Sequence, residues 1–200
     1  LVGSEMCIRD RPDQIGPLEA RLTALPAVER LQTAPMLRGV ITQINGRDAR
    51  SVGGDHWVLR GDRGVSYAAD PPEGTRLVAG AWWPADYSGP PEASLAAREA
   101  AELGLTLGDR LTVNILGRDI EATITSLRDV DYRRDGIGFF LILNAAALTG
   151  APHTNIATVY AAPEAEAGVL RAIAGDWPNV TAIPVREALA RIGEALTLVA

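Results

Sequence analysis

The apolar residues near the start of the chain recur with the period of an amphipathic helix. After Pro12, a residue favoured at the first helical position, one helical face carries Ile15, Leu18, Leu22 and Leu25. Leu25-Pro26 ends this segment. The next residues, Val28 to Ile44, are rich in β-branched and apolar side chains, and Asn45-Gly46 is typical of a tight hairpin turn. The pattern predicts a helix, a strand broken at Pro35 and a hairpin.

A similar arrangement recurs far along the chain. Thr154 to Ala161 is predicted to be a strand, and Pro163 begins a helix whose inward face carries Val169, Leu170 and Ile173. The flanks also match, since Pro12-Asp13…Leu25-Pro26-x-Val28 aligns with Pro163-Glu164…Trp177-Pro178-x-Val180 with a one-residue gap. We interpret the two segments as βαβ-type halves of one sheet. The fold class expected is α+β, with residues 12–46 and 152–185 forming a ferredoxin-like split αβ sandwich.

Residues 47–151 interrupt this sandwich and favour β-structure. Apolar and polar residues alternate from Leu111 to Ile115 and from Ile120 to Ile124, and Gly117-Arg118 fits a two-residue turn between them. Before this hairpin, Pro91-Glu92 predicts a helix start, and Gly104 is placed to end the helix in the left-handed conformation. The shared face of that helix holds Ala93, Ala96, Ala100 and Leu103. We expect a small, barrel-like, β-rich inserted subdomain with one helix.

The two ends of the chain depart from this plan. Residues 1–11 follow neither the helical nor the strand period, and we expect a non-native or disordered tail where the first half lacks its leading strand. Residues 186–200 carry an apolar stripe with steps of three and four, made up of Leu189, Ile192, Leu196 and Val199. This stripe predicts a connecting helix that leads toward a missing membrane segment. We therefore expect the chain to be a fragment.

Composition and charge exclude several classes of function. The 200 residues are 47% hydrophobic and 22% charged, which is typical of a chain that buries a sizeable core. A net charge of −6 argues against a nucleic-acid partner, because such partners favour a basic face. The chain contains no lysine, so it cannot form a Walker-type phosphate loop. Cys7 is the single cysteine and has no partner for an internal disulfide.

The residues that could bind a metal are badly spaced for it. His56 and His153 are far apart, and neither has a cysteine or a second histidine at ligand spacing. Asp129-x-Asp131…Asp135-Gly136 faintly resembles a calcium loop, but the third carboxylate comes two places late and arginines occupy the loop. We predict no metal site.

Other short motifs lack a part that their chemistry requires. Gly64-Val65-Ser66-Tyr67-Ala68 has no second glycine for a nucleophile elbow, and Gly53-Gly54 is too short to cradle a phosphate. We expect Arg60-Gly61-Asp62 to be a turn, and Trp82-Trp83-Pro84 fits either an exposed contact for a lipophilic ligand or a buried pair before a turn. The sequence therefore predicts no catalytic, cofactor-binding or metal-binding residue, no cofactor, and a protein that is not an enzyme.

One set of motifs resembles a known family. Its main stretch begins with Gly80-x-Trp82-Trp83 and continues through Ala100-x-x-Leu103-Gly104-Leu105-x-Leu107-Gly108-Asp109-x-Leu111-Thr112. The others are Gly117, Thr125-Ser126-Leu127-Arg128-x-Val130-Asp131, Phe139-Phe140, Pro12-Asp13-Gln14, Pro35-Met36-x-Arg38-Gly39 and Ile44-Asn45-Gly46-Arg47. Together they resemble the periplasmic core domain of FtsX/MacB-like ABC transporter permeases, and most nearly the YbbP-type permeases, over about residues 12–200.

The resemblance implies a location and a set of partners. It implies a domain in the bacterial periplasm, between the first and second membrane helices of an inner-membrane permease, coupled to a separate cytoplasmic ATPase. The implied partners also include a second periplasmic domain of the same permease and a periplasmic lysophospholipase or thioesterase. The domain would transmit ATP-driven conformational change during export of lipophilic or lipid-like molecules. A helix from Val185 to Val199 would pass the displacement between membrane and sheet.

Two alternatives stay open at this stage. A lipoprotein-releasing permease would share the fold and differ in its cargo. A stand-alone periplasmic binding module or esterase would belong to another class, and activity on acyl esters that a single serine substitution abolishes would identify it.

Overall fold

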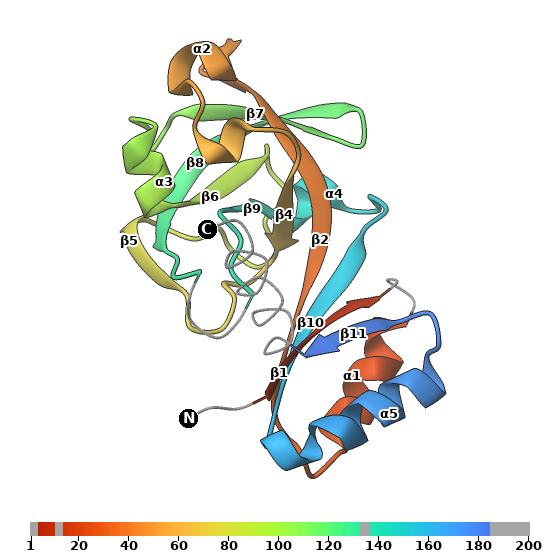
Figure 1. Ribbon diagram of the computed structural model, residues 1–200. Coiled ribbons are helices and arrows are strands. Elements are labelled where there is room, and N and C mark those ends of the chain that lie inside the picture. Colours follow the sequence, from red (N-terminus) through yellow and green to blue (C-terminus); the bar gives the residue numbers. More distant parts are fainter. Residues whose placement is uncertain (1–3, 11–13, 133–136, 185–200) are drawn as a thin grey trace, which may run out of the picture. The chain divides into compact units, whose positions relative to one another are not determined.

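Two compact units make up the chain (Figure 1). The computed structural model describes residues 4–10, 14–132 and 137–184. Unit 1 comprises Leu1–Pro35, Arg134–Ile137 and His153–Ala200, and unit 2 comprises Met36–Arg133 and Gly138–Pro152. The first boundary therefore follows Pro35, whereas the sequence placed it after residue 46, and the second differs by one residue. The expected connecting helix of residues 186–200 lies outside the described residues.

Unit 1 contains two β-α-β segments that meet in one sheet. The elements are β1 (Ser4–Asp10), α1 (Ile15–Thr23), the first part of β2 (Val28–Ile44), β10 (Thr154–Ala161), η2 (Pro163–Ala165), α5 (Glu166–Asp176) and β11 (Thr181–Pro184). The strands lie in the order β11-β1-β10-β2, and β1 pairs antiparallel with both β10 and β11. Both helix-to-strand segments of the sequence repeat, α1 to β2 and α5 to β11, thus belong to this unit.

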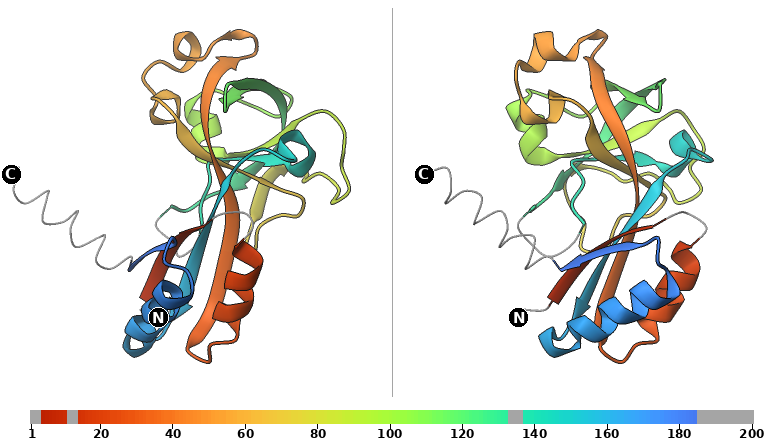
Figure 2. Two further views of the ribbon diagram at one scale, coloured as in Figure 1. Left: turned by 90° about the vertical axis from the view of Figure 1, so that its right-hand side faces the viewer. Right: turned by 45° about the vertical axis from the view of Figure 1, so that its right-hand side comes forward.

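Helices α1 and α5 pack on one face of the unit 1 strands (Figures 1 and 2). Their predicted apolar positions are buried: Leu18 and Leu22 on α1, and Val169 and Ile173 on α5. Alternate residues of β10 complete this core. Burial of a side chain of this size contributes about 1.5 to 3 kcal/mol, so the two helical stripes hold the helices on the sheet.

Strand β1 differs from the tail predicted for residues 1–11. Its register with β10 runs from Ser4 opposite Ala161 to Asp10 opposite Asn155, and its other edge pairs with β11. Residues 4–10 therefore take the position of the leading strand that the first half otherwise lacks. The mixture of charges in this segment hid the strand, because an interior strand is recognised in a sequence by an apolar or alternating run.

Unit 2 is built on a closed ring of six strands. Its elements are the rest of β2, β3 (Arg47–Asp48), α2 (Ala49–Gly53), η1 (Trp57–Leu59), β4 (Arg63–Ala68), β5 (Arg76–Gly80), β6 (Glu92–Ala96), α3 (Ala97–Glu102), β7 (Arg110–Ile115), β8 (Arg118–Asp129), β9 (Leu141–Asn144) and α4 (Ala145–Leu148). The pairings run from β2 to β4, β9, β6, β8, β7 and back to β2, with two parallel and four antiparallel pairs. Such closure is the architecture of a barrel-like domain.

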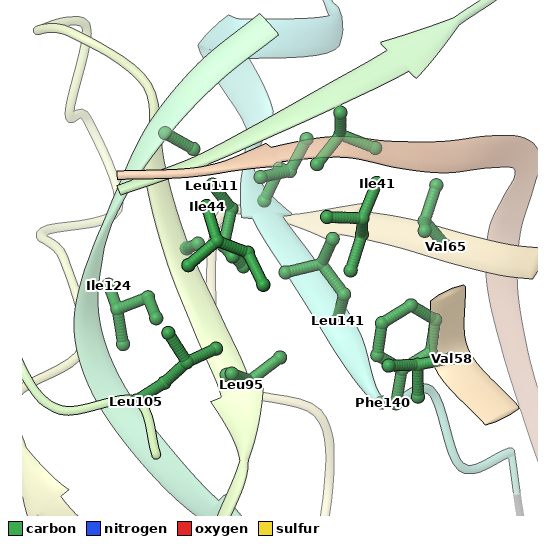
Figure 3. Close-up of a cluster of buried hydrophobic side chains, with 14 of the residues drawn as sticks. Ile41, Ile44, Val58, Val65, Leu95, Leu105, Leu111, Ile124, Phe140 and Leu141 are labelled. Carbon is green, nitrogen blue, oxygen red and sulfur yellow. The ribbon is translucent and has the colours of Figure 1, made fainter. Parts of the chain in front are cut away.

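The interior of this ring is filled by apolar side chains from every strand of it. Figure 3 shows Ile41 and Ile44 of β2 together with Leu95, Leu111, Ile124 and Leu141 from four other strands. Val58 of η1 and Leu105, which follows α3, cover the same core from outside the ring. The alternation of buried and less buried residues along β8 is the pattern by which a strand turns one face inward.

Two tight turns close the hairpins of unit 2. Asn45-Gly46, as predicted, joins β2 to β3 with positive φ at both residues. The β7–β8 turn is instead Leu116-Gly117, with φ values of 52° and 82°, and Arg118 already pairs with Ile115. The prediction therefore placed this turn one residue too late, at Gly117-Arg118. The error arose because leucine is rarely found where a two-residue turn needs positive φ.

Of the helix predicted from Pro91 to Gly104, the first half is a strand and only the second half is helical. Glu92–Ala96 forms β6 between β8 and β9, and only Ala97–Glu102 is helical, with Gly104 at φ 68° just beyond it. The predicted end of the helix is confirmed and its start is wrong. Residues 93–96 are buried on both faces of β6, and periodicity cannot separate such a short apolar run from a helix.

Replacement of Leu116 by asparagine should stabilise the protein. Asparagine adopts positive φ at lower cost than leucine, so we expect Leu116→Asn to raise the free energy of unfolding by about 1 kcal/mol, measured by urea denaturation. Leu107→Asn is the control, because Leu107 is also exposed but has no positive φ. Equal effects of the two substitutions would contradict this explanation.

Candidate functional site

A group of aromatic and charged side chains in unit 2 forms the candidate site. We call it the Trp57 cluster. Its members come from η1 and the residue before it, the first residue of β4, helix α3, and the loop after β8. They are His56, Trp57, Arg63, Arg98, Glu99, Glu102 and Tyr132.

Short-range capping and one glycine bring these elements together. The His56 Nδ1 atom accepts a hydrogen bond from the backbone N–H of Val58 at 3.4 Å, which caps η1. At Gly53, the last residue of α2, a Cβ atom would lie 2.4 Å from Leu103 and 2.6 Å from Leu59. Gly53 therefore allows close packing between α2, η1 and the end of α3, whereas a Cβ at Gly54 would meet no atom within 4 Å.

A chain of charge contacts links His56 to α3. His56 Nε2 lies 2.7 Å from Glu102 Oε2, and Arg98 lies 3.7 Å from the other oxygen of Glu102. Arg98 also donates a hydrogen bond of 2.9 Å to Glu99, whose side chain is fully buried in the first turn of α3. This bond raises the pKa of Arg98. The exposed guanidinium of Arg98 thus partners one oxygen of the buried Glu99 carboxylate.

The aromatic members are held edge to face and carry cations on their faces. The Trp57 ring makes T-shaped contacts with Tyr132 at 6.0 Å and with Phe140 at 5.8 Å. Arg63 lies over Trp57 at 5.5 Å, and Arg98 lies over Tyr132 at 5.7 Å. Burial raises the pKa of the Tyr132 phenol, and the nearby Glu99 carboxylate raises it further. Tyr132 is therefore neutral at physiological pH.

The contacts of the Trp57 cluster position neighbouring elements of secondary structure. A histidine beside a carboxylate is part of many catalytic sites, but the second ring nitrogen of His56 already accepts a backbone N–H. The interactions of the Trp57 cluster thus fix η1, β4 and α3 against one another.

A second polar cluster is buried and joins β6, β8 and Phe139. Arg128 donates to the Ser94 hydroxyl at 2.8 Å, to the Ser94 carbonyl at 3.2 Å and to the Phe139 carbonyl at 3.0 Å. Ser126 also donates to the Ser94 hydroxyl, at 2.7 Å. Burial lowers the pKa of Arg128 to about 10. These acceptors of the buried cation are neutral oxygens, and the Ser94 hydroxyl, which accepts two bonds, has no base beside it in the described part of the chain.

The two histidines, which the sequence already showed to be badly spaced for a metal site, belong to different units. His56 lies in unit 2 and His153 in unit 1. Asp129 pairs with Arg76, while Asp135 lies outside the described residues. Within residues 4–10, 14–132 and 137–184 no three histidine, cysteine or acidic side chains are grouped to hold a metal ion.

The remaining motifs have structural positions. Ser66 is buried within β4. In Arg60-Gly61-Asp62 the chain bends, with a φ of 71° at Gly61, and Asp62 pairs with Arg38 at 2.7 Å. The Trp82 and Trp83 rings lie 4.3 Å apart and donate hydrogen bonds to the carbonyls of Ala69 and Ala68. These two tryptophans thus anchor the loop after β5.

Sequence reasoning missed the Trp57 cluster and the buried Arg128. Trp57, Arg63, Arg98 and Tyr132 are scattered over four segments, so no motif joins them. Arg128 stands on the inward-facing register of β8, in line with Ile124 and Ser126. A charged residue at an inward position of an alternating strand was the available signal.

Comparison with known proteins agrees with the resemblance in the sequence motifs. No protein-family model matches the chain. The uncharacterised ABC transporter permease YbbP of Escherichia coli (strain K12) is 29% identical over 145 residues, which are 71% of this chain and 17% of that protein. A solved domain of a protein assigned as a permease in Porphyromonas gingivalis has a TM-score of 0.43 and 15% identity, with 88% of each chain covered.

The chain is thus similar to part of an ABC transporter permease, as its motifs predicted. It spans 17% of the length of that relative. Among the described residues, no helix is both long enough and apolar enough to cross a membrane.

Loss of Arg128 should destabilise unit 2. Arg128→Met keeps most of the side-chain volume but leaves the Ser94 and Phe139 carbonyls without their donor, so we expect a loss of about 2 kcal/mol in the free energy of unfolding. Chemical denaturation followed by tryptophan fluorescence measures it. Arg118→Met, at an exposed position of the same strand, should change stability by less than about 0.5 kcal/mol. If Arg128→Met lost no more stability than the control, the buried hydrogen bonds of Arg128 would make no net contribution to the free energy of unfolding.

Proposed function

We propose that this chain is an extracytoplasmic domain of an ABC transporter permease. The similarity to a permease over 71% of the chain is the observation that carries the proposal. The full permease would lie in a bacterial inner membrane, with this domain in the periplasm and a separate ATPase bound on the cytoplasmic side. The domain itself would be a transporter component and not an enzyme.

Within that transporter, the domain would transmit conformational change and perform no chemistry. The paired charges of the Trp57 cluster and the neutral partners of Arg128 favour this role, because such contacts fix elements in place and supply no nucleophile with its base. The closed ring of unit 2 favours it too, since a ring of paired strands moves as one body. The strand order β11-β1-β10-β2 supports a ferredoxin-like sandwich for unit 1.

The cargo and the partners are proposed from the family resemblance alone. Lipophilic or lipid-like molecules would be exported, and a second periplasmic domain of the same permease would adjoin this one. A periplasmic lysophospholipase or thioesterase would work beside it. The connecting helix of residues 186–200 would carry displacement from the membrane, on the strength of its apolar stripe in the sequence.

The location can be tested with a single cysteine in the full-length permease. Leu116→Cys, in a background where Cys7 is replaced by serine, puts a thiol at a hairpin tip that is 61% exposed. We expect a membrane-impermeant maleimide to label it in intact cells with a permeabilised outer membrane. Leu111→Cys, in the buried core, is the control and should stay unlabelled. Labelling of the Leu116→Cys variant only after lysis of the inner membrane would place the domain in the cytoplasm.

The coupling role predicts a separation of two activities. Leu189→Pro in the full-length permease interrupts the expected helix, so ATP hydrolysis by the complex should continue while export of a lipophilic dye from membrane vesicles falls at least tenfold. Leu189→Ala keeps the helix propensity and should export at a rate close to that of the unchanged protein. Unimpaired export by the proline variant would rule out this coupling path.

A further inference from the structure

The turn between β2 and β3 carries a chemically labile dipeptide. Asn45-Gly46 is the one place in the sequence where glycine follows asparagine. Asparagine is a thermolabile residue, and a following glycine favours loss of its amide, because glycine has no side chain to shield its own backbone nitrogen. Asn45 is exposed, and a Cβ atom on Gly46 would meet nothing within 4 Å. The turn is therefore open to this reaction and to the water that completes it.

The reaction of such a pair is deamidation through a cyclic imide. The backbone nitrogen of Gly46 attacks the side-chain carbon Cγ of Asn45, so that a new N–C bond forms and the bond from Cγ to Nδ2 breaks. The Nδ2 group leaves as ammonia, with the proton of the Gly46 N–H. Water then opens the ring at either of its two carbonyls and leaves an aspartate or an isoaspartate. Water is the only co-reactant.

The folded structure holds the amide of Asn45 at both of its polar atoms. Nδ2 donates a hydrogen bond of 2.9 Å to Oδ1 of Asp109, and Oδ1 accepts one of 2.8 Å from the backbone N–H of Arg110. The backbone N–H of Asn45 also donates to the Arg110 carbonyl, at 2.8 Å. We call these three bonds the Asn45 clamp. Attack by Gly46 turns Cγ from planar to tetrahedral, so both side-chain bonds lose their geometry as the ring forms.

The carboxylate of Asp109 opposes the reaction electrostatically as well. Its Oδ2 atom accepts hydrogen bonds from the backbone N–H and the hydroxyl of Thr106, at 2.7 and 3.1 Å, which fixes the carboxylate beside Asn45. The bonds from the Thr106 N–H and from Asn45 lower the pKa of Asp109, so this group is ionised at neutral pH. Attack by Gly46 places negative charge on Oδ1 of Asn45, and a fixed negative charge nearby disfavours it.

We propose that Asn45 is a deamidation site, which the Asn45 clamp holds back while unit 2 is folded and which reacts when the β2–β3 turn opens. Either product has lost the amide that donates to Asp109, and it adds one negative charge at this turn. Because like charges repel, the bond to Asp109 does not form again. Deamidation at Asn45 thus records, irreversibly, the time that the turn has spent open.

A second Asn-Gly turn in the same unit tests the proposal. Leu116→Asn creates one with a matching backbone, since φ is 52° and 82° at residues 116 and 117 and 50° and 73° at Asn45 and Gly46. Leu116 is 61% exposed, so the new amide faces water. After incubation at neutral pH, trypsin releases the two turns in separate peptides, residues 39–47 and 111–118, and tandem mass spectrometry measures the loss of each amide. We expect position 116 to react about tenfold faster than Asn45. Equal rates would overturn the proposal.

Two further variants separate the Asn45 clamp from the overall stability of unit 2. Asp109→Ala removes the acceptor of Nδ2 and the neighbouring charge, so we expect the rate at Asn45 to rise about tenfold, toward the rate at position 116. Arg128→Met weakens unit 2 away from the turn and should leave the rate at Asn45 low. An unchanged rate in the Asp109→Ala variant, or an equal rise in both variants, would show that the clamp does not protect Asn45.

Discussion

Strand β2 is shared by the two units, and both depend on it. Its first residues, through Pro35, lie beside β10 in unit 1, and from Met36 onward it pairs with β4 and β7 to close the ring of unit 2. Pro35 has no N–H to donate at the point where the strand passes between units. Gly39 then lets the strand approach its neighbours, because a Cβ there would lie 3.0 Å from Val113. One continuous strand thus makes the sheet of one unit and the barrel of the other.

The buried charge of unit 2 and the charges at its surface have different kinds of partner. Arg128 is buried among hydroxyl and carbonyl oxygens, so its burial is compensated by hydrogen bonds to neutral groups. In the Trp57 cluster, charges at the surface are paired and stacked on aromatic rings. Both arrangements orient elements of secondary structure.

The sequence predicted those parts of the fold in which periodicity and turn chemistry agree. The helical stripes of α1 and α5, the strand at Thr154–Ala161 and the turn at Asn45-Gly46 were all visible in this way. Strand β6 was not, because four buried small and apolar residues suit a helix equally well. Strand β1 was hidden by its mixed composition. In each case neighbours distant in sequence decide the structure.

The candidate site was less predictable than the fold. Its members are single residues on separate segments, and each has an ordinary local role: His56 caps η1, and Glu99 stands in the first turn of α3. Only the packing of η1 against α3 brings them together, and no local pattern encodes that packing. The inward position of Arg128 could have been noticed in the alternation of β8, but its neutral partners could not.

The insertion of unit 2 into unit 1 sets an order for folding. During synthesis, all of unit 2 leaves the ribosome before β10 and β11, the strands between which β1 lies. Unit 2 can therefore fold before the strands that pair with β1, and the helix that shares a core with α1, have been synthesised. Domains whose contacts span long stretches of sequence fold slowly. Unit 1 should accordingly be the last to form, and its unpaired first strand is the part of the nascent chain most in need of a chaperone.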